Sequence, residues 1–100
     1  YWRNSGDGIH AVGRKAANGF RLYDMLGNVW EWTEDWYGEQ FYRCSEPRDP
    51  RGPPVGETRV VRSGSWMLSA WVSRVSNRGG MHPGVEHSDL GFRCVREVFP

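Results

Sequence analysis

The sequence predicts a small α+β or mostly β domain in which loops hold more than half of the chain. Its 100 residues include 13 Gly and 6 Pro, spread along the chain rather than clustered, as is typical of many turns and short elements. No stretch carries a helical pattern longer than two turns, and every strand-like stretch is short. The length fits a single domain.

The first predicted strand follows a tight turn. Residues 5–19 are polar and rich in turn residues, whereas residues 20–37 are dense in aromatic side chains. Within the second stretch, residues 30–32 alternate as a half-buried strand does. Gly27 and Asn28 stand just before them, and both residue types tolerate a positive φ, so we expect the chain to turn there.

The second half of the chain predicts one long loop and two further strands. Residues 46–56 contain four prolines and form a surface loop, because proline does not fit a regular strand or helix interior. Residues 59–62 (RVVR) predict a strand that runs into the small residues 63–65. Residues 90–96 alternate and predict a closing strand.

Composition excludes several classes of function. The 13 Lys and Arg nearly balance the 12 Asp and Glu, giving a net charge of +1, whereas proteins that bind nucleic acids or anionic membranes carry a larger positive excess. No apolar run approaches the roughly 18 residues of a membrane span.

Six Trp residues predict a largely aromatic core. Cys44 and Cys94 allow at most one disulfide bridge, and they can equally be buried thiols.

Four segments, in this order, resemble the formylglycine-generating-enzyme (sulfatase-modifying-factor) family: 18–32 (NGFRLYDMLGNVWEW), 48–53 (RDPRGP), 62–66 (RSGSW) and 91–94 (GFRC). The resemblance implies a loop-rich C-type-lectin-like fold of α+β class, with short antiparallel strands and little helix. The family domain is longer than this chain. Residues 1–100 are therefore expected to be a single domain of this type or the C-terminal part of one, which an upstream segment completes.

A calcium site is expected around the predicted turn. Asp24 and Glu31 flank it, so a reversal of the chain brings two carboxylates together with main-chain carbonyls, the donors that Ca²⁺ prefers. The resemblance implies a structural calcium held by the side chains of Asp24 and Glu31 and the carbonyls of Gly27 and Val29. The alternative is that Glu31 pairs with an interior arginine such as Arg93 and that Asp24 caps a turn.

The resemblance does not carry over the family's catalysis. The family's enzymes use a pair of cysteines that binds copper, and the corresponding positions here hold Leu68 and Ser73. Neither side chain supplies a thiolate, so copper is not expected. The alternative is that the chain is the C-terminal part of a metal-dependent oxidase or sulfoxide synthase of this family, with catalytic residues outside it.

Two other chemistries fit the residue types less well than a structural role does. Ser65, His87 and Asp89 are the types of a nucleophilic triad, but the sequence has no nucleophile-elbow motif. His82, Glu86 and His87 are the types of a metal corner, but their spacing is not that of a zinc helix. Solvated loop histidines explain these residues more simply.

Four arginines in the motif-bearing segments are expected to be structural: Arg62, Arg74, Arg78 and Arg93. A planar guanidinium can satisfy several carbonyls and carboxylates at once. In a chain with little regular structure, we expect these side chains to replace missing backbone hydrogen bonds.

A binding face is expected from residues 66–73 and 81–89. Large apolar residues there follow neither a strand nor a helix period, so some should be exposed, where Trp and Met favour docking of partners. The chain also resembles the C-type-lectin-fold variable proteins of diversity-generating retroelements, which bind different ligands on a fixed scaffold. The expected contact residues for a protein or small ligand are Trp66, Met67, Leu68, Trp71, Ser73, Met81, His82, Val85 and His87. The alternative is that Leu68 and Trp71 fill the core.

Overall fold

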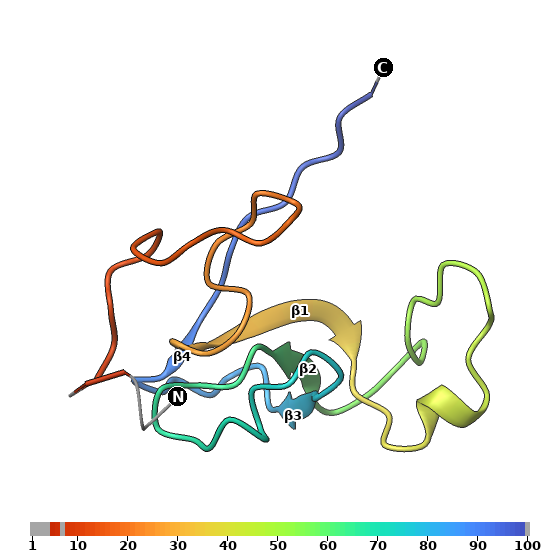
Figure 1. Ribbon diagram of the computed structural model, residues 1–100. Coiled ribbons are helices and arrows are strands. Elements are labelled where there is room, and N and C mark those ends of the chain that lie inside the picture. The colour runs from red at the N-terminus through yellow and green to blue at the C-terminus, as the bar shows by residue number, and fades with distance from the viewer. Residues whose placement is uncertain (1–4, 7, 100) are drawn as a thin grey trace.

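The computed structural model describes residues 5, 6 and 8–99. Its centre is a four-stranded sheet of order β3-β2-β1-β4. The elements are β1 (Trp30–Trp36), the 3-10 turn η1 (Phe41–Arg43), β2 (Arg59–Arg62), β3 (Gly79–Met81) and β4 (Leu90–Gly91). Figure 1 shows long loops on both sides of this sheet. The predicted loop-rich architecture with little helix is confirmed.

β1 and β2 form the antiparallel centre of the sheet. Trp32 pairs with Val61, and the register then shifts before Trp36 pairs with Arg59. The expected aromatic core is found only in part, because the buried apolar side chains among the described residues are Trp30, Val60 and Val61. Trp36 stays half-buried, and the guanidinium of Arg59 stacks 3.5 Å from its ring centroid.

β4 differs from the expectation in direction and length. It pairs with β1 in parallel, so the sheet is mixed rather than antiparallel throughout. The predicted strand over residues 90–96 ends at Gly91, where its ladder to β1 ends. Beyond that point Phe92 is 75% exposed, and alternation alone does not make a strand when no neighbouring strand is there to pair with.

β3 was not predicted, because two of its three residues are glycines. Its pairing with β2 is antiparallel. A Cβ on Gly80 would lie 2.8 Å from Thr58 Oγ1 and from ring atoms of Tyr37. Glycine is therefore required where this strand passes close to its neighbours.

The predicted turn at Gly27 and Asn28 is confirmed, and it joins three segments. Both residues have positive φ, 83° and 64°. Gly27 N donates to Ser63 O (2.6 Å), and Trp66 N donates to Asn28 O (2.8 Å). The Asn28 side-chain amide accepts from His10 N (3.0 Å) and donates to His10 O (3.1 Å). The turn thus fixes both the N-terminal loop and the passage after β2.

Two substitutions separate the contributions of Asn28. Asn28→Gly should lower the free energy of unfolding by about 1–2 kcal/mol, because it removes the bonds to His10 but keeps backbone freedom. Asn28→Ala should cost about 1 kcal/mol more, because a left-handed backbone strains alanine. Urea denaturation measures both, with the exposed Ser76→Ala as the control. Equal stability of the Ala and Gly variants would contradict the backbone-strain argument.

Candidate functional site

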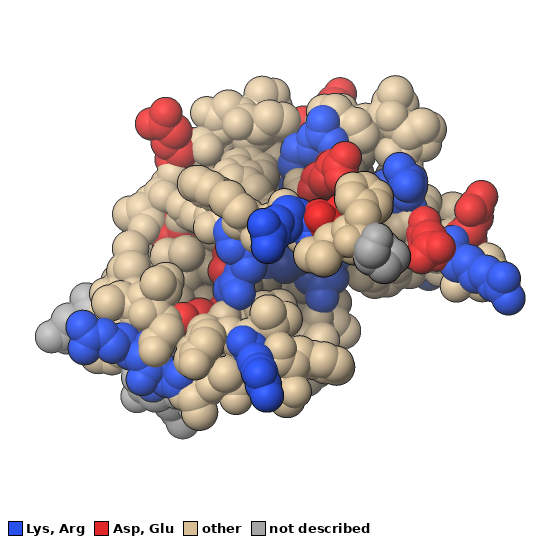
Figure 2. All heavy atoms as spheres, turned by 90° about the horizontal axis from the view of Figure 1, so that it is seen from above, with Lys and Arg blue, Asp and Glu red and all other residues tan. Residues whose placement is uncertain are grey.

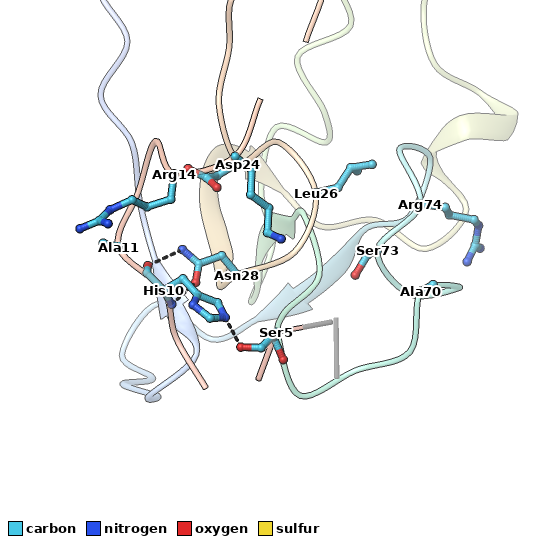
Figure 3. Close-up of a pocket in the computed structure, with 11 residues that line it drawn as sticks. Ser5, His10, Ala11, Arg14, Asp24, Leu26, Asn28, Ala70, Ser73 and Arg74 are labelled. Atoms are coloured by element: carbon cyan, nitrogen blue, oxygen red, sulfur yellow. Dashed lines mark hydrogen bonds between the residues drawn. The ribbon is translucent and has the colours of Figure 1, made fainter. Parts of the chain in front are cut away.

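A cavity of about 560 Å³ lies between the N-terminal loop, the residues leading into the turn and the segment after β2. Figure 3 shows it as a space bounded by these three parts of the chain. Its size falls in the range of small-molecule sites, about 300–1,000 Å³. The polar residues of its lining are Ser5, His10, Arg14, Lys15, Asp24, Asn28, Ser73 and Arg74.

The N-terminal loop forms one wall of this cavity, because side chains of the turn region hold its main chain in place. Asn28 binds both main-chain groups of His10, and Asp24 Oδ2 accepts from Gly13 N at 2.7 Å. His10 Nε2 in turn contacts the carbonyl oxygen of Ser5, so that ring nitrogen is the donor. The loop is therefore positioned by specific polar bonds, not by apolar packing.

Ser73 is the most buried polar residue on the opposite wall. It is 6% exposed, and its hydroxyl has no hydrogen-bond partner among the described residues. The neighbouring Gly64 has a φ of 71°, and a Cβ there would lie 2.5 Å from Ser73 Oγ. Glycine at position 64 therefore leaves the room that the Ser73 side chain occupies.

The expected contact residues divide by exposure. Met67, Trp71, His82, Val85 and His87 are exposed, with Trp71 at 73%. The alternative that Trp71 fills the core is therefore wrong. Its ring instead carries the guanidinium of Arg74, 4.3 Å from the centroid. Trp66, Leu68 and Met81 are half-buried, and Ser73 alone of the whole set lines the cavity.

Three of the four residues expected to hold calcium, Asp24, Gly27 and Glu31, have other partners in this structure. The Glu31 carboxylate accepts from Arg93 Nε at 2.9 Å and from Arg93 Nη2 at 2.6 Å. Arg93 also donates to Tyr23 O (2.8 Å) and Asp24 O (2.9 Å), and the hydrogen bond to Glu31 raises the pKa of Arg93. The Gly27 carbonyl accepts from a serine hydroxyl. The donor types suit Ca²⁺, but an ion here would share Glu31 with Arg93 or displace it.

Ser65, His87 and Asp89 do not form a catalytic triad in this structure. His87 Nδ1 contacts the carboxylate of Asp89, whose side chain is 6% exposed, against 52% for His87. Ser65 is fully buried, and its hydroxyl accepts from Met67 N. No group of three or more His, Cys, Asp or Glu that could hold a metal is found within residues 5, 6 and 8–99. Cys44 and Cys94 are both free and exposed.

The expected structural role of the four arginines is confirmed, because each donates to a main-chain carbonyl. The acceptors are Val75 for Arg62, Trp71 for Arg74, Gly38 and Glu39 for Arg78, and Tyr23 and Asp24 for Arg93. Figure 2 shows basic and acidic side chains interspersed over one face, in keeping with the small net charge.

The sequence did not predict the N-terminal side of the cavity. His10, Arg14 and Lys15 line it, but they lie in a turn-rich stretch without periodicity. The only available signal was Asn28 itself, because a left-handed asparagine can bind a passing main chain.

Comparison with known proteins identifies the relatives of the chain. The profile of the sulfatase-modifying factor enzyme 1-like domain matches residues 2–98. A serine/threonine-protein kinase pkn1 of Chlamydia pneumoniae is 45% identical over 81% of this chain and 13% of its own length. The formylglycine-generating enzyme of Bos taurus is 38% identical over 83% of this chain and 23% of its own length. The chain thus spans less than a quarter of these two proteins.

Two solved structures have the same fold. Treponema denticola variable protein 1 superposes with a TM-score of 0.83 at 46% identity, over 92% of this chain and 33% of that one. PvdO from Pseudomonas aeruginosa superposes with a TM-score of 0.79 at 27% identity, over 92% and 36%. The expected fold of the formylglycine-generating-enzyme and variable-protein type is confirmed. Within the described residues no helix is long and apolar enough to cross a membrane.

The Arg93–Glu31 pair gives a direct test of this region. Arg93→Ala should lower the free energy of unfolding by about 1–3 kcal/mol, because it removes four hydrogen bonds, although solvent screens part of the ion pair. Arg93→Lys should restore only part of this, because lysine has no bidentate fork. Chemical denaturation measures the loss, and the exposed Arg96→Ala is the matched control. A control that costs as much as Arg93→Ala would refute a specific role.

Proposed function

The chain belongs to the sulfatase-modifying factor enzyme 1-like family, and from this we propose that it is a ligand- or protein-binding module and not a formylglycine-generating catalyst. The observation that supports this most is the pair Leu68 and Ser73, which stand where the resemblance places catalytic cysteines. The likeness to a variable protein in sequence and structure favours binding over catalysis.

The proposed binding face consists of residues 66–73 and 81–89. Three large apolar side chains of this face are exposed to solvent: Trp71 at 73%, Val85 at 41% and Met67 at 40%. Exposed Trp and Met side chains favour partner docking, because they offer large apolar area and adaptable contacts. We propose that these three residues supply the main apolar contacts to a protein or small ligand.

The proposed module is the C-terminal part of a larger domain. Phe20 is 85% exposed, Phe92 75% and Val95 96%, and all three lie on segments that Arg93 links by its bonds to Tyr23 and Glu31. A monomeric domain rarely leaves so many large apolar side chains in water. An upstream segment of the same protein is the proposed cover for them.

A structural calcium ion at Asp24, Gly27, Val29 and Glu31 is a separate proposal. It rests on the carboxylate and carbonyl donors around the turn, and Arg93 competes with it for Glu31. A bound ion stabilises only the folded state, so a chelator should lower the melting temperature.

Chelation and substitution together test the calcium proposal. EGTA should lower the melting temperature of the wild type, added Ca²⁺ should restore it, and Asp24→Ala should abolish this response. Arg93→Ala should increase the response, because it frees the Glu31 carboxylate. Asp49→Ala, at an exposed carboxylate in the proline-rich loop, is the control. A wild-type melting curve that is the same in excess EGTA and in Ca²⁺ would end the proposal.

The binding face is tested with peptides selected from a displayed library on the wild-type protein. Trp71→Ala should weaken the selected peptides about tenfold, because an exposed aromatic anchor is lost. The free energy of unfolding should change by less than about 0.5 kcal/mol. Val55→Ala, an equally exposed apolar residue in the proline-rich loop, should leave binding unchanged. Selected peptides that bind Trp71→Ala as tightly as the wild type would refute this face.

A second candidate function is the C-terminal part of a metal-dependent oxidase or sulfoxide synthase of the family. The identity to formylglycine-generating enzymes favours it, and its catalytic residues would lie outside this chain. Oxygen uptake by the copper-loaded full protein with a cysteine-containing peptide is the test. Turnover would replace the binding proposal, and its absence under these conditions would support it.

A further inference from the structure

Arg74 ties together less of the fold than the other arginines that bind main-chain carbonyls. Its Nη1 donates to Trp71 O at 2.8 Å, an acceptor only three residues away in the same loop. Arg62 and Arg78 are half-buried, and they donate to carbonyls 13 and 40 residues away. Arg74 is exposed and forms no ion pair among the described residues. A guanidinium has five N–H groups, so most of those of Arg74 are available to a partner.

The Arg74 guanidinium lies over the Trp71 ring, with Cζ 4.3 Å from the ring centroid. Trp71 is 73% exposed, so the rest of the ring is open to solvent. Figure 3 shows the Arg74 side chain directed away from the cavity. The pair therefore presents a cation and an aromatic surface side by side on the outside of the molecule.

Short-range hydrogen bonds hold the main chain that carries this pair. Val72 N donates to Ser69 O at 3.1 Å, and Asn77 N donates to Arg74 O at 3.0 Å. The Asn77 side-chain amide also donates to Val72 O at 2.8 Å. Because these bonds already order the loop, less conformational entropy is lost when a partner binds to it.

The sequence around the pair lacks acidic residues. Residues 58–85 contain four arginines and no Asp or Glu, although the whole chain has a net charge of only +1. Glu86 is the first acidic residue after this stretch. Asp24 lines the same cavity as Arg74, but its carboxylate accepts from Gly13 N. An unpaired guanidinium beside an exposed aromatic ring favours a carboxylate in its partner.

We propose that Trp71 and Arg74 bind an acidic segment of a partner protein, in which Asp or Glu stands beside a large apolar residue. The carboxylate accepts from free N–H groups of Arg74, and the apolar neighbour packs on the open part of the Trp71 ring. This inference rests on the proposed binding face and adds the chemistry of its partner. A nucleic acid fits less well, because its repeated phosphates need several free cations. Arg62 and Arg78 instead donate to main-chain carbonyls.

The test uses peptides selected on the wild-type protein from a displayed random library. The selected peptides should be enriched in Asp or Glu next to a large apolar residue, relative to the unselected library. Arg74→Gln should weaken them about fivefold and reduce the salt dependence of their affinity, because a charge-assisted hydrogen bond is lost. Arg74→Lys should restore part of the affinity, because it keeps the charge without the planar fork. Arg48→Gln, which removes an exposed charge from the proline-rich loop, should leave binding unchanged.

A charge reversal on both sides separates a direct contact from a general charge effect. Arg74→Glu should weaken the tightest selected peptide more than Arg74→Gln does, because two carboxylates then face each other. A peptide in which the acidic residue is replaced by Lys should bind Arg74→Glu better than it binds the wild type. Equal binding of this peptide to both proteins would contradict a direct contact with Arg74.

The outcomes distinguish this inference from the proposed binding face. Peptides that lose affinity with Trp71→Ala but bind Arg74→Gln as tightly as the wild type would overturn the acidic partner and leave the face in place. Peptides that are insensitive to Trp71→Ala, or the selection of no peptide at all, would refute both. Arg48→Gln weakening the peptides as much as Arg74→Gln, or their displacement by a single-stranded oligothymidylate, would also overturn the inference. The first result would indicate overall charge, and the second a nucleic-acid partner.

Discussion

The structure depends on one left-handed turn, at Gly27 and Asn28. Only three apolar side chains are buried among the described residues, so apolar burial cannot by itself hold the long loops. The turn does so with hydrogen bonds. Asn28 binds both main-chain groups of His10 with its side chain, and its own carbonyl accepts from Trp66. Through these bonds the turn joins the N-terminal loop at His10 to the residues after β2 at Ser63 and Trp66.

Arginine side chains extend the same principle over the rest of the fold. Arg93 joins the segment after β4 to Glu31 in β1 and to the carbonyls before the turn, and Arg78 binds the carbonyls of the loop after β1. These guanidinium groups donate hydrogen bonds to main-chain carbonyls in loops, where no neighbouring strand supplies a donor. The small net charge reflects nearly equal numbers of basic and acidic residues. It does not describe the cavity, whose basic residues Arg14 and Lys15 have no acidic partner among the described residues.

The features that could be predicted from the sequence are those that local residue types determine. The turn and the strand at residues 59–62 were predicted because their residue types favour one local conformation. The closing strand over residues 90–96 was overextended, because strand formation needs a neighbour and the ladder to β1 ends at Gly91. Gly79–Met81 was missed, because glycines do not favour a strand, and Gly80 is required there by its close approach to Tyr37. The cavity was missed because contacts between segments distant in the sequence create it, and composition carries no trace of them.

Amide hydrogen exchange in the wild-type protein tests the central role of the turn most directly. If the turn joins three segments, the amides of His10, Gly27 and Trp66 should be protected and should open together, with similar free energies of opening. The exposed amide of Val55, in the proline-rich loop, gives the unprotected reference. A His10 amide that exchanges as fast as this reference while Gly27 and Trp66 stay protected would contradict the account, because the N-terminal loop would then not depend on the turn.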